Sequence, residues 1–309
     1  MSSFCLIYSN KSYSVLEFYK KRFLRIVPGY WTITIVNLLL LVLSNIIFSK
    51  NYFHTSTNVI DYIINLLLIH GVVPGAANNH VVLGGWYIGT SNILYLIFPL
   101  LYKLYFRIQS VHRYLYFPIV TFILCYILIT CFEFILGIKC TNNSFLYFSF
   151  INQLPVFVLG FSLYDILNKE IVIKHLQLKA ILFLILSCIT FYHPSLNSYT
   201  ITPFIFTLSI MYLFLICHNS HSIYENRLLR LLTKFLDISF SIYLTHTYVI
   251  YNLFGMIIIK LLRNIGFYQY PTLAYVVLLP IIYIIVYIVG DIFNAYLNKI
   301  NNRLIAINC

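Results

Sequence analysis

Charged residues are scarce in this 309-residue sequence: only 9% of the residues are Asp, Glu, Lys or Arg, and only eight are acidic. Hydrophobic residues make up 61% of the chain, and the mean hydropathy is +0.87. A soluble core cannot enclose that much apolar surface. The shortage of charge therefore excludes an ordinary soluble globular domain and favours a chain that places apolar segments in a lipid bilayer.

Other features that the sequence lacks narrow the class further. The seven cysteines form no C-x-x-C pair, so we expect neither a disulfide framework nor a metal site. No basic groove with stacking aromatics stands in a polar context, which argues against nucleic acid as a partner despite the net charge of +12. The apolar stretch from Met1 to Ile7 is short and is followed by polar residues, so we expect no cleavable signal peptide.

Apolar runs long enough to cross a bilayer occur throughout the chain. A spanning helix needs roughly 20 apolar residues, and helix is expected because every backbone amide in lipid needs an internal partner. We predict an all-α polytopic bundle that forms a single membrane domain over residues 1–309, with about eight transmembrane helices. The predicted spans are Pro28–Phe48, Trp86–Phe106, Tyr116–Ile138, Phe145–Leu167, Leu178–Tyr192, Thr200–Cys217, Phe235–Leu262 and Pro271–Leu297.

One further run, Val59–Val73, is too short and too polar to be a span. It has about 15 residues and contains Asp61, Asn65 and His70, so we predict a short interfacial or re-entrant helix. Counting it as a ninth span would place every later basic loop outside the cell. The bias of Lys and Arg toward cytoplasmic loops argues against that count.

With eight spans and a cytoplasmic N-terminus, sixteen of the twenty basic residues fall on the inner side, and we expect both termini to be cytoplasmic. The outer segments then hold only Lys50, Lys139, Lys260 and Arg263. Membrane topology therefore accounts for the net positive charge, and membrane lipid is the expected partner of the basic surface.

Ionisable residues inside spans are expensive in lipid and are therefore candidates for function. We single out Glu133, Asp237, His246 and Asp291. His246 ends the segment Ser239-Phe-Ser241-Ile-Tyr243-Leu-Thr245-His246, and a neutral imidazole there could act as a base or orient a substrate hydroxyl. The alternative is a structural histidine that bonds a neighbouring helix.

Two other segments carry polar or charged residues at the end of a span. Phe18-Tyr-Lys-Lys-Arg22-Phe-Leu-Arg25-Ile-Val-Pro28-Gly-Tyr30 sets Arg22 and Arg25 about one helical turn apart, where they could bind phosphate or simply anchor the helix. The second segment opens a span with small and polar residues and reads Gly84-Gly-Trp86-Tyr-Ile-Gly-Thr-Ser-Asn-Ile-Leu-Tyr95-Leu-Ile-Phe-Pro99. Taken alone, it is also typical of an aromatic belt at the membrane surface.

Together, in this order, the three segments resemble the hallmarks of acyltransferase family three, the integral membrane O-acyltransferases that modify surface polysaccharides. The first resembles FY-x-R-R-x-x-R-I-x-P-x-Y. The second resembles W-x-L-x-x-E-x-x-x-Y-x-x-x-P, matching Trp86, Tyr95 and Pro99, and the third resembles S-Y-S-x-Y-L-x-H, matching Ser239, Ser241, Tyr243, Leu244 and His246.

The resemblance implies a membrane enzyme, in the bacterial inner or plasma membrane, that transfers an acyl group, usually acetyl from cytoplasmic acetyl-CoA, to a hydroxyl of a cell-surface or lipid-linked glycan. It implies no metal. Arg22 and Arg25 would bind the donor, His246 would be catalytic, and the substrate path would include Trp86, Tyr95, Ser241 and Tyr243.

The sequence also departs from that family. Ser91 or Asn92 stands where the family has glutamate, and Asp291-Ile-Phe293 replaces the usual E-x-P. Ser3-Phe-Cys-Leu-Ile7 resembles the end of the family's second span, so we expect this chain to lack the first two spans and the histidine that the first one carries. A truncated remnant, a partner subunit in an oligomer with a second membrane protein, and a glycan-lipid flippase or polysaccharide polymerase are the alternatives.

Overall fold

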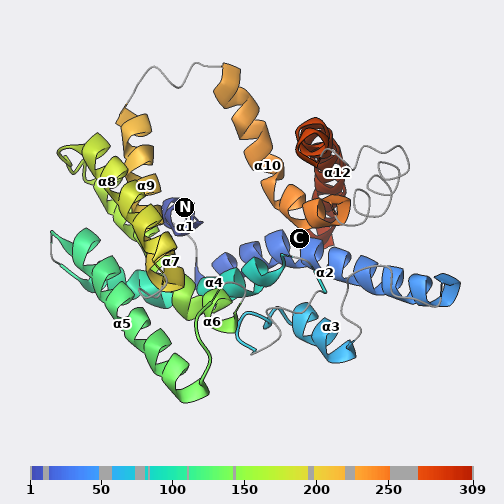
Figure 1. Ribbon diagram of the computed structural model, residues 1–309. Coiled ribbons are helices and arrows are strands. Elements are labelled where there is room, and N and C mark those ends of the chain that lie inside the picture. The colour runs from blue at the N-terminus through green and yellow to red at the C-terminus, as the bar shows by residue number, and fades with distance from the viewer. Residues whose placement is uncertain are drawn as a thin grey trace. The chain divides into compact units, whose positions relative to one another are not determined.

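The computed structural model describes residues 2–9, 14–48, 58–73, 81–82, 84–109, 111–141, 144–193, 198–219, 227–250 and 271–307. Every regular element in these ranges is a helix (Figure 1), which confirms the all-α prediction. The chain divides into two units, each described by itself below. Unit 1 comprises Met1–Lys20, Leu68–Asn78 and Trp86–Tyr224, and unit 2 comprises Lys21–Leu67, Asn79–Gly85 and Glu225–Cys309.

Unit 1 is organised around the helix α7. This helix packs against α1, α4, α5 and α9, while α8 lies along α9. Most of the α7 side chains are buried by these neighbours, which makes α7 the centre of the unit. The helices are α1 (Ser2–Ser9), α4 (Trp86–Arg107), α5 (Arg113–Leu136), α6 (Phe145–Phe148), α7 (Phe150–Asn168), α8 (Leu176–Tyr192) and α9 (Ser198–Asn219).

A serine separates the two helices α6 and α7. Ser149 has an extended backbone (φ −60°, ψ 148°), and its side chain accepts a hydrogen bond from the backbone N–H of Asn152. Ser144 caps α6 in the same way through the N–H of Tyr147. Because serine satisfies the free N–H groups at a helix start, the predicted span Phe145–Leu167 becomes a one-turn helix followed by a long one.

Aromatic side chains fill the space between α7, α4 and the part of α2 (Val15–Phe48) that belongs to unit 1. Phe18 stacks on Phe98 with ring centroids 5.1 Å apart, and Phe98 in turn meets the ring of Phe161 at 5.7 Å. Helix α1 approaches α7 where a glycine leaves room: a Cβ on Gly160 would lie 2.6 Å from the backbone N of Phe4. Ring packing and this close approach hold the unit together.

Unit 2 contains α2 (Val15–Phe48) from Lys21 onward, α3 (Val59–Leu66), α10 (Arg227–Tyr248) and α12 (Pro271–Ile307). Helices α10 and α12 pack along each other. They approach each other closely at Gly290, where a Cβ would lie 2.6 Å from a side-chain carbon of Ile242. Small residues allow helix backbones to approach in this way where no hydrophobic effect drives association.

Four helical segments among the described residues are long and apolar enough to cross a membrane. They are Arg113–Leu136, Phe145–Asn168, Tyr199–Asn219 and Leu278–Arg303, and α8 is a shorter apolar helix. The other predicted spans also fall on helices, although residues 251–262 of the seventh span lie outside the described residues. The count of eight spans and the single membrane domain therefore stay predictions.

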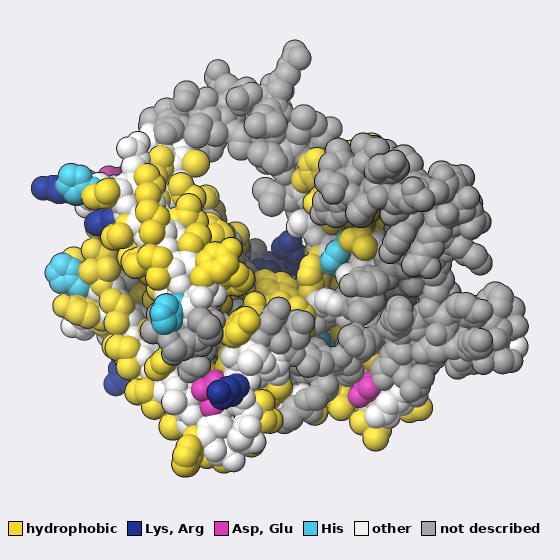
Figure 2. All heavy atoms as spheres, in the orientation of Figure 1, with side chains coloured by type: hydrophobic (Ala, Val, Ile, Leu, Met, Phe, Trp, Pro, Cys, Tyr) yellow, Lys and Arg dark blue, Asp and Glu magenta, His cyan; other side chains and the backbone are white. Residues whose placement is uncertain are grey.

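Hydrophobic side chains cover the exposed faces of the unit 1 helices. Figure 2 shows such a face over α8 and α9, with the Lys and Arg side chains near its edges. On α5, the exposed fractions of Phe134 and Ile135 are 90% and 73%. Large apolar surfaces of this kind are unfavourable in water and are expected where a helix faces lipid.

The run Val59–Val73 is helical only over the eight residues Val59–Leu66, as α3, so it does not form a span. The chain then turns at Leu68 (φ +59°) and leads to His70, which is 1% exposed. The Nε2 atom of His70 accepts a hydrogen bond from the backbone N–H of Gly89 at 3.1 Å. The prediction of a short, non-spanning helix is confirmed, and the buried histidine fixes the beginning of α4.

We expect Gly89→Ala to loosen the start of α4. A Cβ there would lie 2.6 Å from the His70 ring and 2.7 Å from the backbone N of Gly71, where no flexible side chain can move aside. Overpacking of this kind costs about 1–3 kcal/mol. Thermal unfolding in detergent should show a lower Tm, whereas Leu96→Ala, which changes an exposed side chain of the same helix, should leave the Tm nearly unchanged. Equal Tm values for both variants would contradict the close approach.

Candidate functional site

The segment that carries Arg22 and Arg25 lies on the N-terminal half of α2. Arg25 is exposed, and Arg22 is partly buried with its Nε atom enclosed. Farther along, Gly29 lies seven residues from Arg22 and so shares its face of the helix. A Cβ on Gly29 would lie 3.1 Å from side-chain atoms of Leu244 on α10 and Leu297 on α12. The face that carries Arg22 therefore continues into the contact of α2 with α10 and α12.

The aromatic pair that follows Gly29 fixes α3 against α2. The hydroxyl of Tyr30, which is completely buried, donates a hydrogen bond to Oδ1 of Asn65. The Nε1–H of Trp31 donates to the backbone carbonyl of Leu66 at 2.8 Å. Asn65 also donates to the carbonyl of Asp61 at 2.8 Å. A buried, hydrogen-bonded tyrosine at this position holds the short helix in place.

A pair of glycines, Gly84 and Gly85, lies between α2 and α10 in unit 2. A Cβ on Gly85 would lie 2.9 Å from the Tyr30 hydroxyl. The hydroxyl of Tyr243 on α10 donates a hydrogen bond to the carbonyl of Gly84. Gly84 has φ +77°, a conformation that favours glycine. Residues from the first and third sequence segments thus meet at the two glycines that directly precede Trp86 in the chain.

His246 lies one turn beyond Tyr243 on α10. Its Nδ1 is 2.7 Å from the backbone carbonyl of Tyr243, and the two rings are 5.7 Å apart. Because a carbonyl oxygen can only accept, Nδ1 must carry the proton. In the neutral ring Nε2 then holds the free lone pair, which is the tautomer that a general base requires.

Ser241, which lies on α10 like His246, makes a contact with α12. It is 1% exposed, and its Oγ donates to Oδ1 of Asn294 on α12 at 3.3 Å. The acids Asp237 and Asp291, noted in the sequence, are exposed. The substrate-path role of Ser241 stays a prediction, and its described contact joins α10 to α12.

Trp86 and Tyr95 belong to unit 1. The ring of Trp86 stacks on Phe148 with centroids 4.6 Å apart and contacts Tyr147 at 6.3 Å. Tyr95 packs beside Phe157 at the edge of the aromatic core of the unit. The structure therefore groups Arg22, Arg25, Ser241, Tyr243 and His246 in unit 2, and Trp86 and Tyr95 in unit 1; their functional roles stay predictions.

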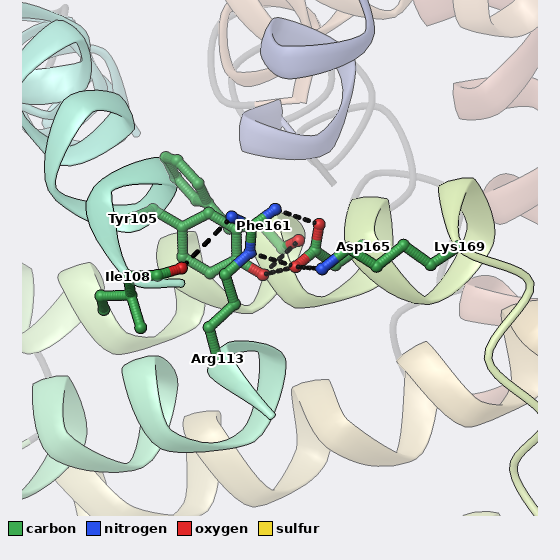
Figure 3. Close-up of polar contacts among 6 residues, drawn as sticks. All are labelled: Tyr105, Ile108, Arg113, Phe161, Asp165 and Lys169. Atoms are coloured by element: carbon green, nitrogen blue, oxygen red, sulfur yellow. Dashed lines mark hydrogen bonds and ion pairs between the residues drawn. The ribbon is translucent and has the colours of Figure 1, made fainter. Parts of the chain in front are cut away.

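Sequence reasoning missed a buried ionic cluster in unit 1 (Figure 3). At its centre is Asp165 on α7, whose side chain is 1% exposed. Arg113, at the start of α5, donates to both of its oxygens, at 2.5 and 2.8 Å, while the Tyr105 hydroxyl donates at 2.8 Å. The Lys169 ammonium lies 3.2 Å from it. The guanidinium also lies over the rings of Tyr105 and Phe106, so the cluster ties α4, α5 and α7 together.

Glu133, also singled out in the sequence, accepts a hydrogen bond from the loop that follows α5. Its Oε1 accepts the backbone N–H of Cys140 at 2.6 Å. Burial raises the pKa of the Cys140 thiol to about 11, so this group stays protonated at neutral pH. Glu133 therefore holds the chain after α5, which favours a structural role for it. In the described part of the chain, no group of three or more His, Cys, Asp and Glu could hold a metal ion.

The sequence model of a family described as an acyltransferase domain matches residues 1–291. This match covers nearly the whole chain, which therefore belongs to acyltransferase family 3. It is an integral membrane protein with acyltransferase activity as its expected chemistry. No curated protein sequence and no solved structure matches the chain significantly.

Proposed function

We propose that this acyltransferase transfers acetyl from cytoplasmic acetyl-CoA to a hydroxyl of a cell-surface or lipid-linked glycan. The observation that carries the proposal is the bond from Nδ1 of His246 to the Tyr243 carbonyl at 2.7 Å, which leaves Nε2 as the basic nitrogen. Membership of the family supplies the reaction class. The basic segment at the start of α2 supports an anionic donor.

In the proposed reaction, Nε2 of His246 takes the proton from the acceptor hydroxyl as its oxygen attacks the acetyl carbonyl carbon. The carbon–sulfur bond of the thioester then breaks, and the CoA thiolate leaves and takes the proton from Nε2, which restores the neutral ring of His246. Arg22 and Arg25, one turn apart, bind donor phosphates with charge-assisted hydrogen bonds. Tyr243, whose hydroxyl donates a hydrogen bond to the carbonyl of Gly84, is part of the proposed acceptor path.

Acetyl-CoA should stabilise the detergent-purified chain against heat, and Arg25→Ala should remove that effect. A ligand present at a hundred times its Kd adds about 2.7 kcal/mol to the free energy of unfolding. The measurement is the Tm with and without acetyl-CoA, with ATP and a polyphosphate as ligand controls. Lys103→Ala, which removes one exposed positive charge from α4, is the matched variant and should keep the shift.

A shift with acetyl-CoA alone that is lost in Arg25→Ala would support a donor site at the start of α2. An equal shift with all three anions would indicate general charge binding. The absence of any shift in a folded sample would count against the proposed donor and would favour the partner-subunit or flippase alternatives.

A further inference from the structure

His70 is a buried titratable residue of unit 1 to which the proposed reaction assigns no role. Its Nε2 atom accepts the backbone N–H of Gly89 at 3.1 Å. A ring nitrogen that accepts a hydrogen bond carries no proton, so the proton of the neutral imidazole is on Nδ1. The backbone of α4 therefore holds the His70 ring in one tautomer and in one orientation.

Two glycines bring the loop that carries His70 into direct contact with the first turns of α4. A Cβ on Gly89 would lie 2.6 Å from Cδ2 and from Nε2 of the His70 ring, and a Cβ on Gly71 would lie 2.6 Å from the backbone N of Thr90. No side chain separates the two segments at these points. Because close-packed backbone yields little, the position of this loop determines the position of the first turns of α4.

The same face of α4 carries Trp86. Gly89 and Thr90 follow Trp86 by three and four residues, so all three lie on one side of the helix. The Thr90 hydroxyl donates to the backbone carbonyl of Phe148 at 2.6 Å. The indole of Trp86 stacks on the ring of Phe148, with centroids 4.6 Å apart and an angle of 29° between the rings. The face of α4 that contacts His70 is therefore the face that holds Trp86 against Phe148.

Part of the Trp86 side chain stays accessible. The three residues that begin one position beyond its neighbour, Ile88, Gly89 and Thr90, are buried, whereas Trp86 is only partly buried. Phe148 covers one face of the indole, and the orientation of the ring is set by that stacking. An accessible ring in a fixed orientation suits a group that positions a substrate, for which a displacement of about 1 Å can cost on the order of 100-fold in rate.

We propose that His70 is a positioning residue for acyl transfer, which acts through the first turns of α4 and fixes the indole of Trp86. The inference rests on the proposed function, with Trp86 on the substrate path. The feature that His70 contributes is an uncharged acceptor atom in a flat ring, which fits against the bare backbone at Gly89. A side chain that keeps such an acceptor can replace it, and an apolar side chain of similar size cannot.

The position of Trp86 can be measured directly, because the chain has only two tryptophans. The purified chain is labelled with 5-fluorotryptophan, and its two ¹⁹F resonances are assigned with Trp86→Phe. His70→Leu, which removes the acceptor, should shift the Trp86 resonance. The resonance of Trp31, which belongs to unit 2, is the internal reference and should not move. His70→Gln has a side-chain oxygen that can accept the same N–H, so it should leave both resonances at the parent positions.

Turnover is measured with [¹⁴C]acetyl-CoA and membranes of the producing cells as the source of acceptor. His70→Leu should lower kcat about tenfold or more while the KM for acetyl-CoA stays within about twofold, and His70→Gln should retain the parent kcat. Met211→Ala is the control for lost stability, because Met211 is buried in unit 1 beside Leu163 and Leu215. It should lower the Tm and leave the Trp86 resonance in place.

An unmoved Trp86 resonance or an unchanged kcat in His70→Leu would overturn the proposal, as would an equal shift in Met211→Ala or in His70→Gln. If His70→Leu does not fold, Thr90→Val takes its place. It removes the hydroxyl that donates to Phe148, and the Trp86 resonance must then move. Absence of acetylation by the parent chain would refute the proposed function, whereas the ¹⁹F comparison would still decide whether His70 fixes Trp86.

Discussion

Asp165→Asn is expected to lower the Tm of the detergent-solubilised chain by on the order of 10 °C, as a loss of about 3–5 kcal/mol implies. The substitution removes the negative charge from a side chain that is 1% exposed and leaves Arg113, 12% exposed, without its counter-charge. Removing one partner of a buried pair is costly because the other charge stays desolvated. The Tm is measured by thermal unfolding in one detergent for all variants.

Lys169→Ala is the control for that prediction, because it also removes an ion-pair partner of Asp165. The Lys169 side chain is 37% exposed, so solvent screens the pair and the loss should be only about 0–1 kcal/mol. Arg113→Leu combined with Asp165→Leu should recover part of the stability, since neither charge is then buried. Equal losses for Asp165→Asn and Lys169→Ala would show that the cluster does not hold α4, α5 and α7 together.

The length of the apolar runs predicted helix positions well, because an apolar segment in lipid must form a helix to satisfy its backbone hydrogen bonds. The predicted span Trp86–Phe106 became α4, Trp86–Arg107, and Leu178–Tyr192 became α8, Leu176–Tyr192. Helix α2 begins at Val15, so the helix extends beyond the predicted span Pro28–Phe48 on its N-terminal side. Lys and Arg form helix readily outside the bilayer, and hydropathy measures only the apolar part.

Side-chain partners were much harder to predict than helices. Arg113 and Asp165 are separated by 52 positions in the sequence, and no local pattern pairs them. One signal was present, since Asp165 is an acid inside a predicted span and such residues usually have a partner. The meeting of Tyr30 and Tyr243 at the glycine pair carries no such signal, because tyrosine is common throughout this chain and hydroxyl partners depend on the packing of separate helices.

His246→Ala should lower acyl transfer about 10²–10⁴-fold if His246 is the general base of the proposed reaction. The described bond of His246 is to a carbonyl of its own helix, so its removal should cost only about 1 kcal/mol of stability. The measurement is acetyl-CoA-dependent acetylation of a glycan acceptor in membranes. His218→Ala is the control, because His218 lies on α9 in unit 1, stacked on Phe214, and is not among the residues of the proposed reaction.

Catalysis and donor binding can then be separated within one variant. His246→Ala retains Arg22 and Arg25, so acetyl-CoA should still raise its Tm as it does in the parent chain. Lost turnover with an intact shift is the pattern expected of a base that acts on the acceptor hydroxyl. Unchanged acetylation would remove His246 from the site. Loss of both turnover and the acetyl-CoA shift in Tm would mean that His246 maintains the structure of unit 2. The bond to the Tyr243 carbonyl would then be the structural histidine contact that the sequence also allowed.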